Sequence, residues 1–213
     1  MKVLTVIFLA ATISVALALP WEPEPRTEQY WIARHNGFIQ NSLNNNASIN
    51  ILFYGDLHTE GWSAVGRPTF EEYYAPLGVS NYAIGADRIE HTLYRISDGE
   101  VTDNIKTKLC VIKMSQTNLE GNDDLEIALG NVILVNDLRE RQPNMKILLL
   151  GILNIPKNSE EWANRISNIN RIMRSLDNGR TIRFLDMNEH FQSEGSFPFG
   201  LFAGDLIHLS AAG

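Results

Sequence analysis

The chain has 213 residues, of which 44% are hydrophobic and 20% charged, and its formal net charge is −7. This length and composition predict one folded domain with a single core and exclude an extended disordered chain. The acidic balance, with no basic run, leaves no electrostatic basis for binding nucleic acid or an anionic membrane.

The N-terminus is typical of a secretory signal peptide over residues 1–18. Lys2 supplies the positive start, an apolar centre follows it, and Ala16-Leu17-Ala18 is a small-x-small cleavage site. The apolar stretch is short for a membrane-spanning helix, and a polar linker over residues 19–29 comes directly after it. We therefore expect a secreted, extracellular protein that begins near Leu19.

Asn46 belongs to the one N-glycosylation sequon, Asn46-Ala47-Ser48, in a polar loop before the first predicted strand. Export and exposure together predict a glycan there. Cys110 is the only cysteine, so no internal disulfide can form, and its apolar run predicts a small buried side chain. The single cysteine and the unpaired spacing of the histidines favour no metal site, and we expect no cofactor.

Apolar runs alternate with helical patterns through most of the chain. The predicted strands are 49–54, 79–84, 109–114, 146–152 and 181–186, and the predicted helices are 28–43, 69–74, 88–97, 123–141 and 159–176. This alternation predicts an α/β fold in which about five parallel strands are covered on both faces. Leu57, Ala86 and Asn118 each follow a strand, and His208 follows the last by a long loop. We therefore expect these four residues to meet at the carboxyl edge of the sheet.

Gly55-Asp56-Leu57 ends the first predicted strand, where one class of hydrolases carries Gly-Asp-Ser. Five blocks in the same order resemble the SGNH (GDSL) hydrolases, and within them the catalytic α subunits of platelet-activating factor acetylhydrolase. The blocks are Phe53–Asp56, Asn81–Asp87, Arg88–Gly99, Gln116–Asn118 and Asp205–Leu209. The resemblance begins at about Trp31. It implies a three-layer α/β/α, flavodoxin-like SGNH domain over residues 30–213.

The resemblance also implies roles for single residues. His208 corresponds to the family's catalytic base and Asp205 to the carboxylate that orients it. Ala86 stands where the family has the glycine whose backbone N–H serves the oxyanion hole, and Asn118 stands for the oxyanion asparagine. Leu57 occupies the position of the nucleophilic serine, and leucine can neither attack a carbonyl nor donate a hydrogen bond.

Two more positions in these blocks depart from the family pattern. Gln116 stands where the family has glycine before its Thr-Asn pair. In a register shifted by one residue, Ser115 takes the glycine position and Thr117 that of the asparagine. Alanine at position 86 keeps the N–H but resists a positive φ. Asp56 and Asp87 are expected to fix turns through local hydrogen bonds, and His58, which adjoins the lost serine, is expected to point elsewhere.

These departures favour a secreted, catalytically impaired homologue of the acetylhydrolase α subunit, that is, a pseudoenzyme. We expect it to bind a small ester or lipid, or to act as a homodimer. The alternative is an active carboxylic-ester hydrolase. A third hypothesis is a fragmentary gene product, because the family continues into a final helix after the block at His208, and we expect this domain to lack that helix. A secreted chain would not meet the family's cytosolic WD-repeat partner.

Overall fold

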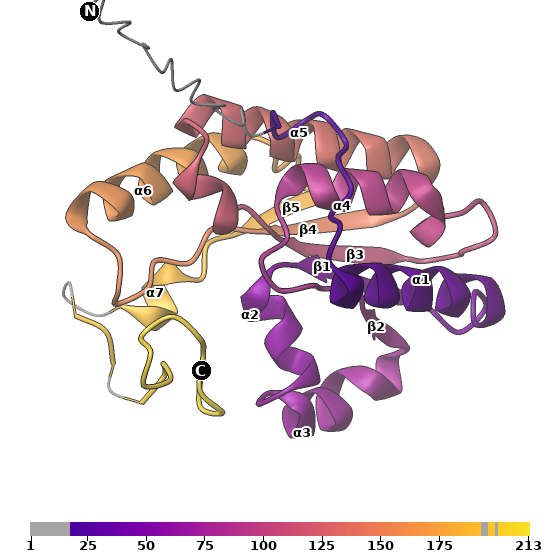
Figure 1. Cartoon of the computed structure of the whole chain (residues 1–213), viewed down its shortest axis with the longest axis horizontal. Coiled ribbons are helices and arrows are strands. Elements are labelled where there is room, and N and C mark those ends of the chain that lie inside the picture. The colour runs from indigo at the N-terminus through magenta and orange to yellow at the C-terminus, as the bar shows by residue number, and fades with distance from the viewer. Residues whose placement is uncertain (1–17, 193–195, 199) are drawn as a thin grey trace, which may run out of the picture.

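The structure, a computed structural model, describes residues 18–192, 196–198 and 200–213, so the predicted signal peptide lies outside the described residues except for Ala18. Five strands form one parallel sheet in the order β2-β1-β3-β4-β5. Their bounds are β1 Ile51–Gly55, β2 Val79–Asn81, β3 Leu109–Lys113, β4 Lys146–Leu150 and β5 Ile182–Leu185. The predicted α/β fold with five parallel strands is therefore confirmed (Figure 1).

The five predicted helical regions are also present. The helices are α1 Gln29–Asn44, α2 Leu57–Glu60, α3 Arg67–Thr69, α4 Ile89–Arg95, α5 Asp124–Arg141, α6 Glu160–Arg174 and α7 Asn188–Phe191. Short helical turns are η1 Gly61–Ser63, η2 Phe70–Tyr74, η3 Ala75–Leu77, η4 Ile96–Glu100 and η5 Thr117–Glu120. The sequence patterns did not predict α2 or α7, each of which has only four residues.

The handedness of the crossovers decides which face of the sheet each helix covers. The connections through α4, α5 and α6 all move along the sheet in one direction, whereas the connection from β1 to β2 moves in the other. Parallel crossovers are right-handed, so these two sets lie on opposite faces. Figure 1 shows α4, α5 and α6 above the sheet and α2 and α3 below it.

Helix α5 begins as expected but leaves part of its apolar surface exposed to solvent. Asp123 and Glu126 form a reciprocal capping box, which fixes its first turn. Two of its leucines, Leu125 and Leu129, are 70% and 45% exposed. Ile127, Leu134, Leu138 and their neighbours face the sheet instead. Cys110 is fully buried in β3, as predicted.

The segment that we predicted as a linker packs against the domain. Pro20 is buried against Gly130 of α5, where an added Cβ would lie 2.6 Å from the Pro20 Cβ. Further on, the Glu24 N–H donates to the Glu90 carbonyl at 3.2 Å. Among the described residues, no helix has the length and apolar character needed to cross a bilayer.

Candidate active site

The turn after β1 places Leu57 at the first position of α2. Asp56 caps this helix, because its carboxylate accepts from the His58 N–H at 3.2 Å. Gly55 is required before it, since a Cβ there would lie 2.0 Å from the Thr59 Oγ1 and 2.8 Å from the Lys113 carbonyl. Leu57 itself is half-buried. The expected local hydrogen bond of Asp56 is present.

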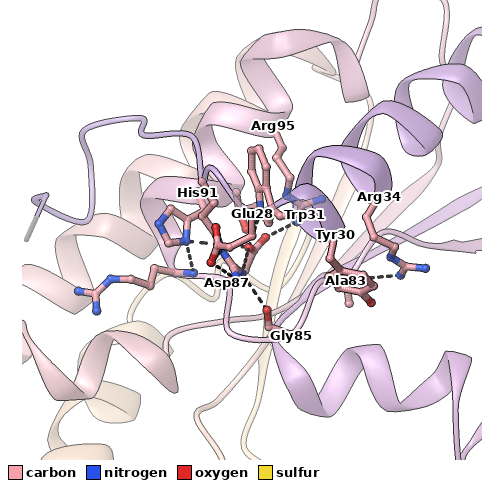
Figure 2. Close-up of polar contacts among 12 residues, drawn as sticks. Glu28, Tyr30, Trp31, Arg34, Ala83, Gly85, Asp87, His91 and Arg95 are labelled. Atoms are coloured by element: carbon pink, nitrogen blue, oxygen red, sulfur yellow. Dashed lines mark hydrogen bonds and ion pairs between the residues drawn. The ribbon is translucent and has the colours of Figure 1, made fainter.

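Ala86 adopts the left-handed backbone that glycine would take most easily. Its φ is +61°, and the residue is exposed at the turn after β2. A left-handed L-residue costs roughly 1–2 kcal/mol, so neighbouring contacts must hold the turn. The Arg26 guanidinium supplies two of them, donating to the Gly85 carbonyl at 2.9 Å and to the Asp87 carboxylate at 3.1 Å. Figure 2 labels both acceptor residues, Gly85 and Asp87.

Asp87 is the centre of this support. Its buried carboxylate accepts from the Trp31 indole at 2.8 Å and forms an ion pair with Arg95 at 3.0 Å. Burial raises the pKa of Asp87, while the charges of Arg95 and Arg26 oppose that rise. The expectation of a local, turn-fixing bond is corrected here: the side chain joins the turn to α1, α4 and the N-terminal segment. Trp31 is itself buried.

Asn118 is fully buried in η5, and neighbouring groups occupy its side chain. Its Nδ2 donates to Glu90 at 2.9 Å and to Asn122 at 3.1 Å, and its Oδ1 accepts from the Ile89 N–H at 3.0 Å. Arg88 completes this cluster through bonds to Glu90 and Asn122. Both amide hydrogens of Asn118 are therefore used within the protein, and in this conformation neither remains for a substrate oxygen.

The backbone before Asn118 bears on the register of this block. Ser115 has a φ of +88°, whereas Gln116 has a φ of −57°. The position that favours glycine is therefore Ser115, which agrees with the register that gives Thr117 the asparagine position. Ser115 is fully buried, and its hydroxyl accepts from Asn131 at 2.8 Å.

Asp205 and His208 form a close pair on the C-terminal segment. The His208 Nδ1 lies 2.6 Å from the Asp205 Oδ2, while the Asp205 Oδ1 accepts from the N–H groups of Ile207 and His208 at 3.0 Å. These hydrogen bonds lower the pKa of Asp205 well below its usual range. The carboxylate is therefore ionised at neutral pH and orients the imidazole, and both side chains are about half exposed.

The structure brings all four predicted positions to the carboxyl edge of the sheet. Leu57, Ala86 and Asn118 follow β1, β2 and β3, and the C-terminal segment lies near α2 and α7 in Figure 1. The contact that joins this segment to α2 is a hydrogen bond at 2.9 Å between the His58 Nε2 and the Ile207 carbonyl.

Sequence reasoning missed Lys113, Glu90 and Arg88. Lys113 ends the apolar strand β3, yet its ammonium is buried within 3.2 Å of the Asp56 carboxylate. A charged residue directly after four strand residues of apolar type was the signal that could have found it. Glu90 and Arg88 gave no such signal, because charged residues in the first turn of a helix usually face solvent.

An open cleft of about 630 Å³ lies beside this edge, between η5, the start of α5 and α6. Its lining includes Asn122, Asp123, Glu161 and Arg165. None of the predicted catalytic or oxyanion positions lines it.

Comparison with known proteins identifies the family to which this arrangement belongs. The sequence profile of the GDSL-like Lipase/Acylhydrolase family matches residues 53–213. The chain is therefore a member of the GDSL-like lipase and acylhydrolase family.

Individual relatives share little more than a quarter of their residues with this chain. Platelet-activating factor acetylhydrolase IB subunit alpha2 of Rattus norvegicus is 28% identical over 186 residues, which cover 86% of this chain and 78% of the relative. Subunit alpha1 of the human enzyme is 26% identical over 185 residues, covering 86% and 77%. The crystal structure of a GDSL-like lipase from Bacteroides thetaiotaomicron superposes with a TM-score of 0.64 at 15% identity, covering 84% of this chain and 91% of that one. The likeness to that lipase supports the fold.

Proposed function

We propose that this protein is a secreted, catalytically impaired relative of the platelet-activating factor acetylhydrolase α subunits that binds an ester or lipid at the carboxyl edge of its sheet. The observation that carries this proposal is the combination of leucine at position 57, where the family has its nucleophilic serine, with a closely paired Asp205 and His208. In a comparable serine-hydrolase site, loss of the nucleophile alone lowers turnover by about 10⁶.

The oxyanion side supports the same proposal. If Asn118 is the oxyanion asparagine, both of its amide hydrogens are used by Glu90 and Asn122. In the register that the backbone of Ser115 favours, Thr117 takes that position, and a threonine side chain has no amide to donate. A missing oxyanion donor lowers the rate by about 10²–10³ in comparable enzymes. Chemistry therefore has two independent obstacles, whereas ligand binding needs neither the serine nor this donor.

The ligand class comes from the relatives. Because they are named as acetylhydrolases of platelet-activating factor, we propose a small ester or an acetylated lipid as the ligand. Homodimerisation, export through the N-terminal 18 residues and a glycan on Asn46 belong to the same proposal.

An active carboxylic-ester hydrolase is the second candidate. Two observations favour it: the 2.6 Å contact of His208 with Asp205, and the left-handed turn that Ala86 keeps at the family's glycine position. Such an enzyme would need another nucleophile within hydrogen-bond reach of the His208 Nε2.

One pair of assays on the purified secreted protein separates these candidates. We expect no turnover of p-nitrophenyl acetate above that of a His208→Ala control, and no labelling by a fluorophosphonate. Stoichiometric labelling of any serine, together with turnover that His208→Ala abolishes, would establish the hydrolase and overturn the proposed impairment.

Binding is then tested by thermal shift with an acetylated phospholipid and its deacetylated counterpart. A ligand that binds only the folded state raises the unfolding midpoint in a concentration-dependent way. We expect the acetylated lipid to raise the midpoint more. Equal shifts would show lipid binding without recognition of the acetyl group and would contradict the acetylated ligand class. Absent shifts, combined with no turnover, would contradict ligand binding.

A further inference from the structure

We propose that His58, the residue after the lost nucleophile position, is a positioning residue that fastens the Asp205–His208 turn to the carboxyl edge of the sheet. The proposal rests on the proposed function only because it takes Asp205 and His208 as the pair that corresponds to the family's catalytic carboxylate and base. It begins from a single contact, the hydrogen bond at 2.9 Å between the His58 Nε2 and the Ile207 carbonyl.

This contact stands out because the C-terminal segment otherwise bonds to itself. Within the described residues, the remaining hydrogen bonds of residues 200–213 are internal, such as those from the Ala203 N–H to the His208 carbonyl at 2.8 Å and from the Ser210 N–H to the Leu201 carbonyl at 2.9 Å. Phe202 adds ring contacts with Phe191 and Phe197. The bond from His58 to Ile207 therefore attaches the C-terminal segment to α2 at the residue directly before His208.

A buried ion pair, Lys113 with Asp56, holds the Nδ1 side of the His58 ring, which faces away from the C-terminal turn. The Lys113 Nζ lies 2.7 Å from the His58 Nδ1 and 3.1 Å from the Asp56 Oδ2. The side chains of His58 and Lys113 are each 4% exposed, and that of Asp56 is fully buried. The carboxylate stabilises the lysine as an ammonium ion, against the burial that lowers the pKa of Lys113.

The ammonium ion determines the tautomer of His58. An ammonium has only donors, so the His58 Nδ1 must accept from it. The ring proton of the neutral imidazole then resides on Nε2, which donates to the Ile207 carbonyl. Burial, together with the Lys113 charge, lowers the pKa of His58 to about 4, so the ring is neutral at pH 7.

The chain of contacts Asp56–Lys113–His58–Ile207 therefore runs from β1 and β3 to the turn that carries the catalytic-type pair. The Lys113 ammonium donates to both Asp56 oxygens and to the His58 Nδ1, and the His58 Nε2 donates to the Ile207 carbonyl. The turn is strained as well, since Leu206 has a φ of +60°. A left-handed leucine requires a fixed neighbourhood, and the bond to the next residue, Ile207, supplies one.

The experiment compares His58→Phe, which keeps an aromatic ring without the N–H, with His58→Gln, whose amide can both accept from Lys113 and donate to Ile207. Hydrogen exchange is followed by mass spectrometry in peptides covering residues 201–209 and in peptides from β1 and β3. We expect His58→Phe to accelerate exchange in 201–209 by at least about fivefold, with little change in β1 and β3. We expect His58→Gln to restore protection.

Nitrogen NMR of the imidazole in the unmodified protein provides a second, independent reading. We expect the His58 Nε2 to be protonated and the Nδ1 to be an unprotonated acceptor at pH 7. The proposal is overturned if the proton resides on Nδ1, if His58→Phe leaves exchange in 201–209 unchanged, or if all peptides accelerate equally. Because neither measurement uses ligand or turnover, failure of the proposed function would leave these results interpretable.

Discussion

Three residues at the carboxyl edge carry backbone strain that glycine would avoid. Of the described residues other than glycine, Ala86, Ser115 and Leu206 have a positive φ, at +61°, +88° and +60°. They belong to three different loops: those after β2, after β3 and within the C-terminal turn. Strained backbone that surrounding contacts maintain is concentrated at functional sites. The edge therefore keeps strained backbone of the kind found at functional sites, although position 57 carries leucine.

Ala86→Gly should stabilise the protein by about 0.5–1 kcal/mol, because glycine adopts a positive φ without steric cost. The matched control is Ala33→Gly, at an exposed position inside α1, which should destabilise by about 1 kcal/mol. Urea unfolding at pH 7 measures both. A loss of stability in Ala86→Gly would mean that the left-handed turn is not the state occupied in solution.

Leu57→Ser should restore only weak esterase activity. The serine would supply the attacking oxygen and His208 its base, but no oxyanion amide is free in either register. Asn118 donates to Glu90 and Asn122, and in the register that Ser115 favours the position belongs to Thr117. One absent oxyanion donor keeps the rate about 10²–10³ below that of a complete site. Initial rates with p-nitrophenyl acetate are compared with Leu57→Ala, which opens the same space without a nucleophile. Equal rates in the two variants would remove His208 from the role of base for this serine.

At the scale of elements, the sequence predicted the strands to within about three residues at either end. Apolar runs such as Leu109–Ile112 are unambiguous, because parallel strands buried on both faces need them. The directions in which the side chains of the site point could not be predicted from the sequence. Asn118 turns to Glu90 and His58 turns to Lys113, and these partners come from other elements, so no local pattern could reveal them. The apolar pattern of α5 does not single out its buried face, because apolar residues surround the helix and Leu125 and Leu129 are left in solvent.

The packing of the N-terminal segment on α5 predicts opposite effects for one substitution at two glycines. In Gly130→Ala, the new Cβ would lie 2.6 Å from the Pro20 Cβ and 3.1 Å from the Ile89 Cδ1. We expect a loss of about 1–3 kcal/mol from this overpacking. In Gly37→Ala, nothing lies within 4 Å, so the helix propensity of alanine should stabilise α1 by about 0.5–1 kcal/mol. Thermal midpoints of both variants test these signs, and a Gly130→Ala midpoint that is not lowered would contradict this packing.

Acid should destabilise the edge through buried histidines. Burial is the main cause that lowers the pKa of both His58 and His91 from 6.5 to about 4. At His58 the charge of Lys113 lowers the pKa further, and the other charged or titratable neighbours are Asp56 and His208. The unfolded chain takes up protons first as the pH falls, so stability present above pH 6.5 is lost progressively towards pH 4. For His58 alone this loss is roughly 3 kcal/mol.

His35 opposes this trend. Its burial lowers the pKa, but hydrogen bonds with Glu100 and Asp98 outweigh burial and raise it. The stability that His35 contributes is present below pH 6.5 and is lost as the pH rises.

The contribution of His58 is tested by urea unfolding at pH 7 and pH 4.5, which compares the unmodified protein with His58→Gln. The variant should lose less stability on acidification. An equal loss would show that His58 is not the group that takes up the proton.

At the scale of the whole molecule, the position of the predicted cleavage site agrees with the packing of residues 19–29. Pro20 is buried on α5 and Arg26 holds the Ala86 turn, so a chain that begins near Leu19 keeps both contacts. Asn46 lies in the turn after α1 with part of its surface in solvent. A glycan there would extend from a loop that precedes β1, at the end of the sheet opposite the candidate site.

We therefore expect the exported protein to begin near Leu19 and to carry a glycan on Asn46. Expression in a secreting eukaryotic cell, followed by N-terminal sequencing and glycosidase treatment, measures both. Asn46→Gln should abolish the mobility change while leaving secretion and the unfolding midpoint nearly unchanged, because the side chain has no hydrogen-bond role in the core. Asn45→Gln, which leaves the sequon intact, is the control and should keep the glycan. Recovery of an uncleaved chain from the cytosol, unaffected by glycosidase, would contradict export and remove the reason to exclude cytosolic partners.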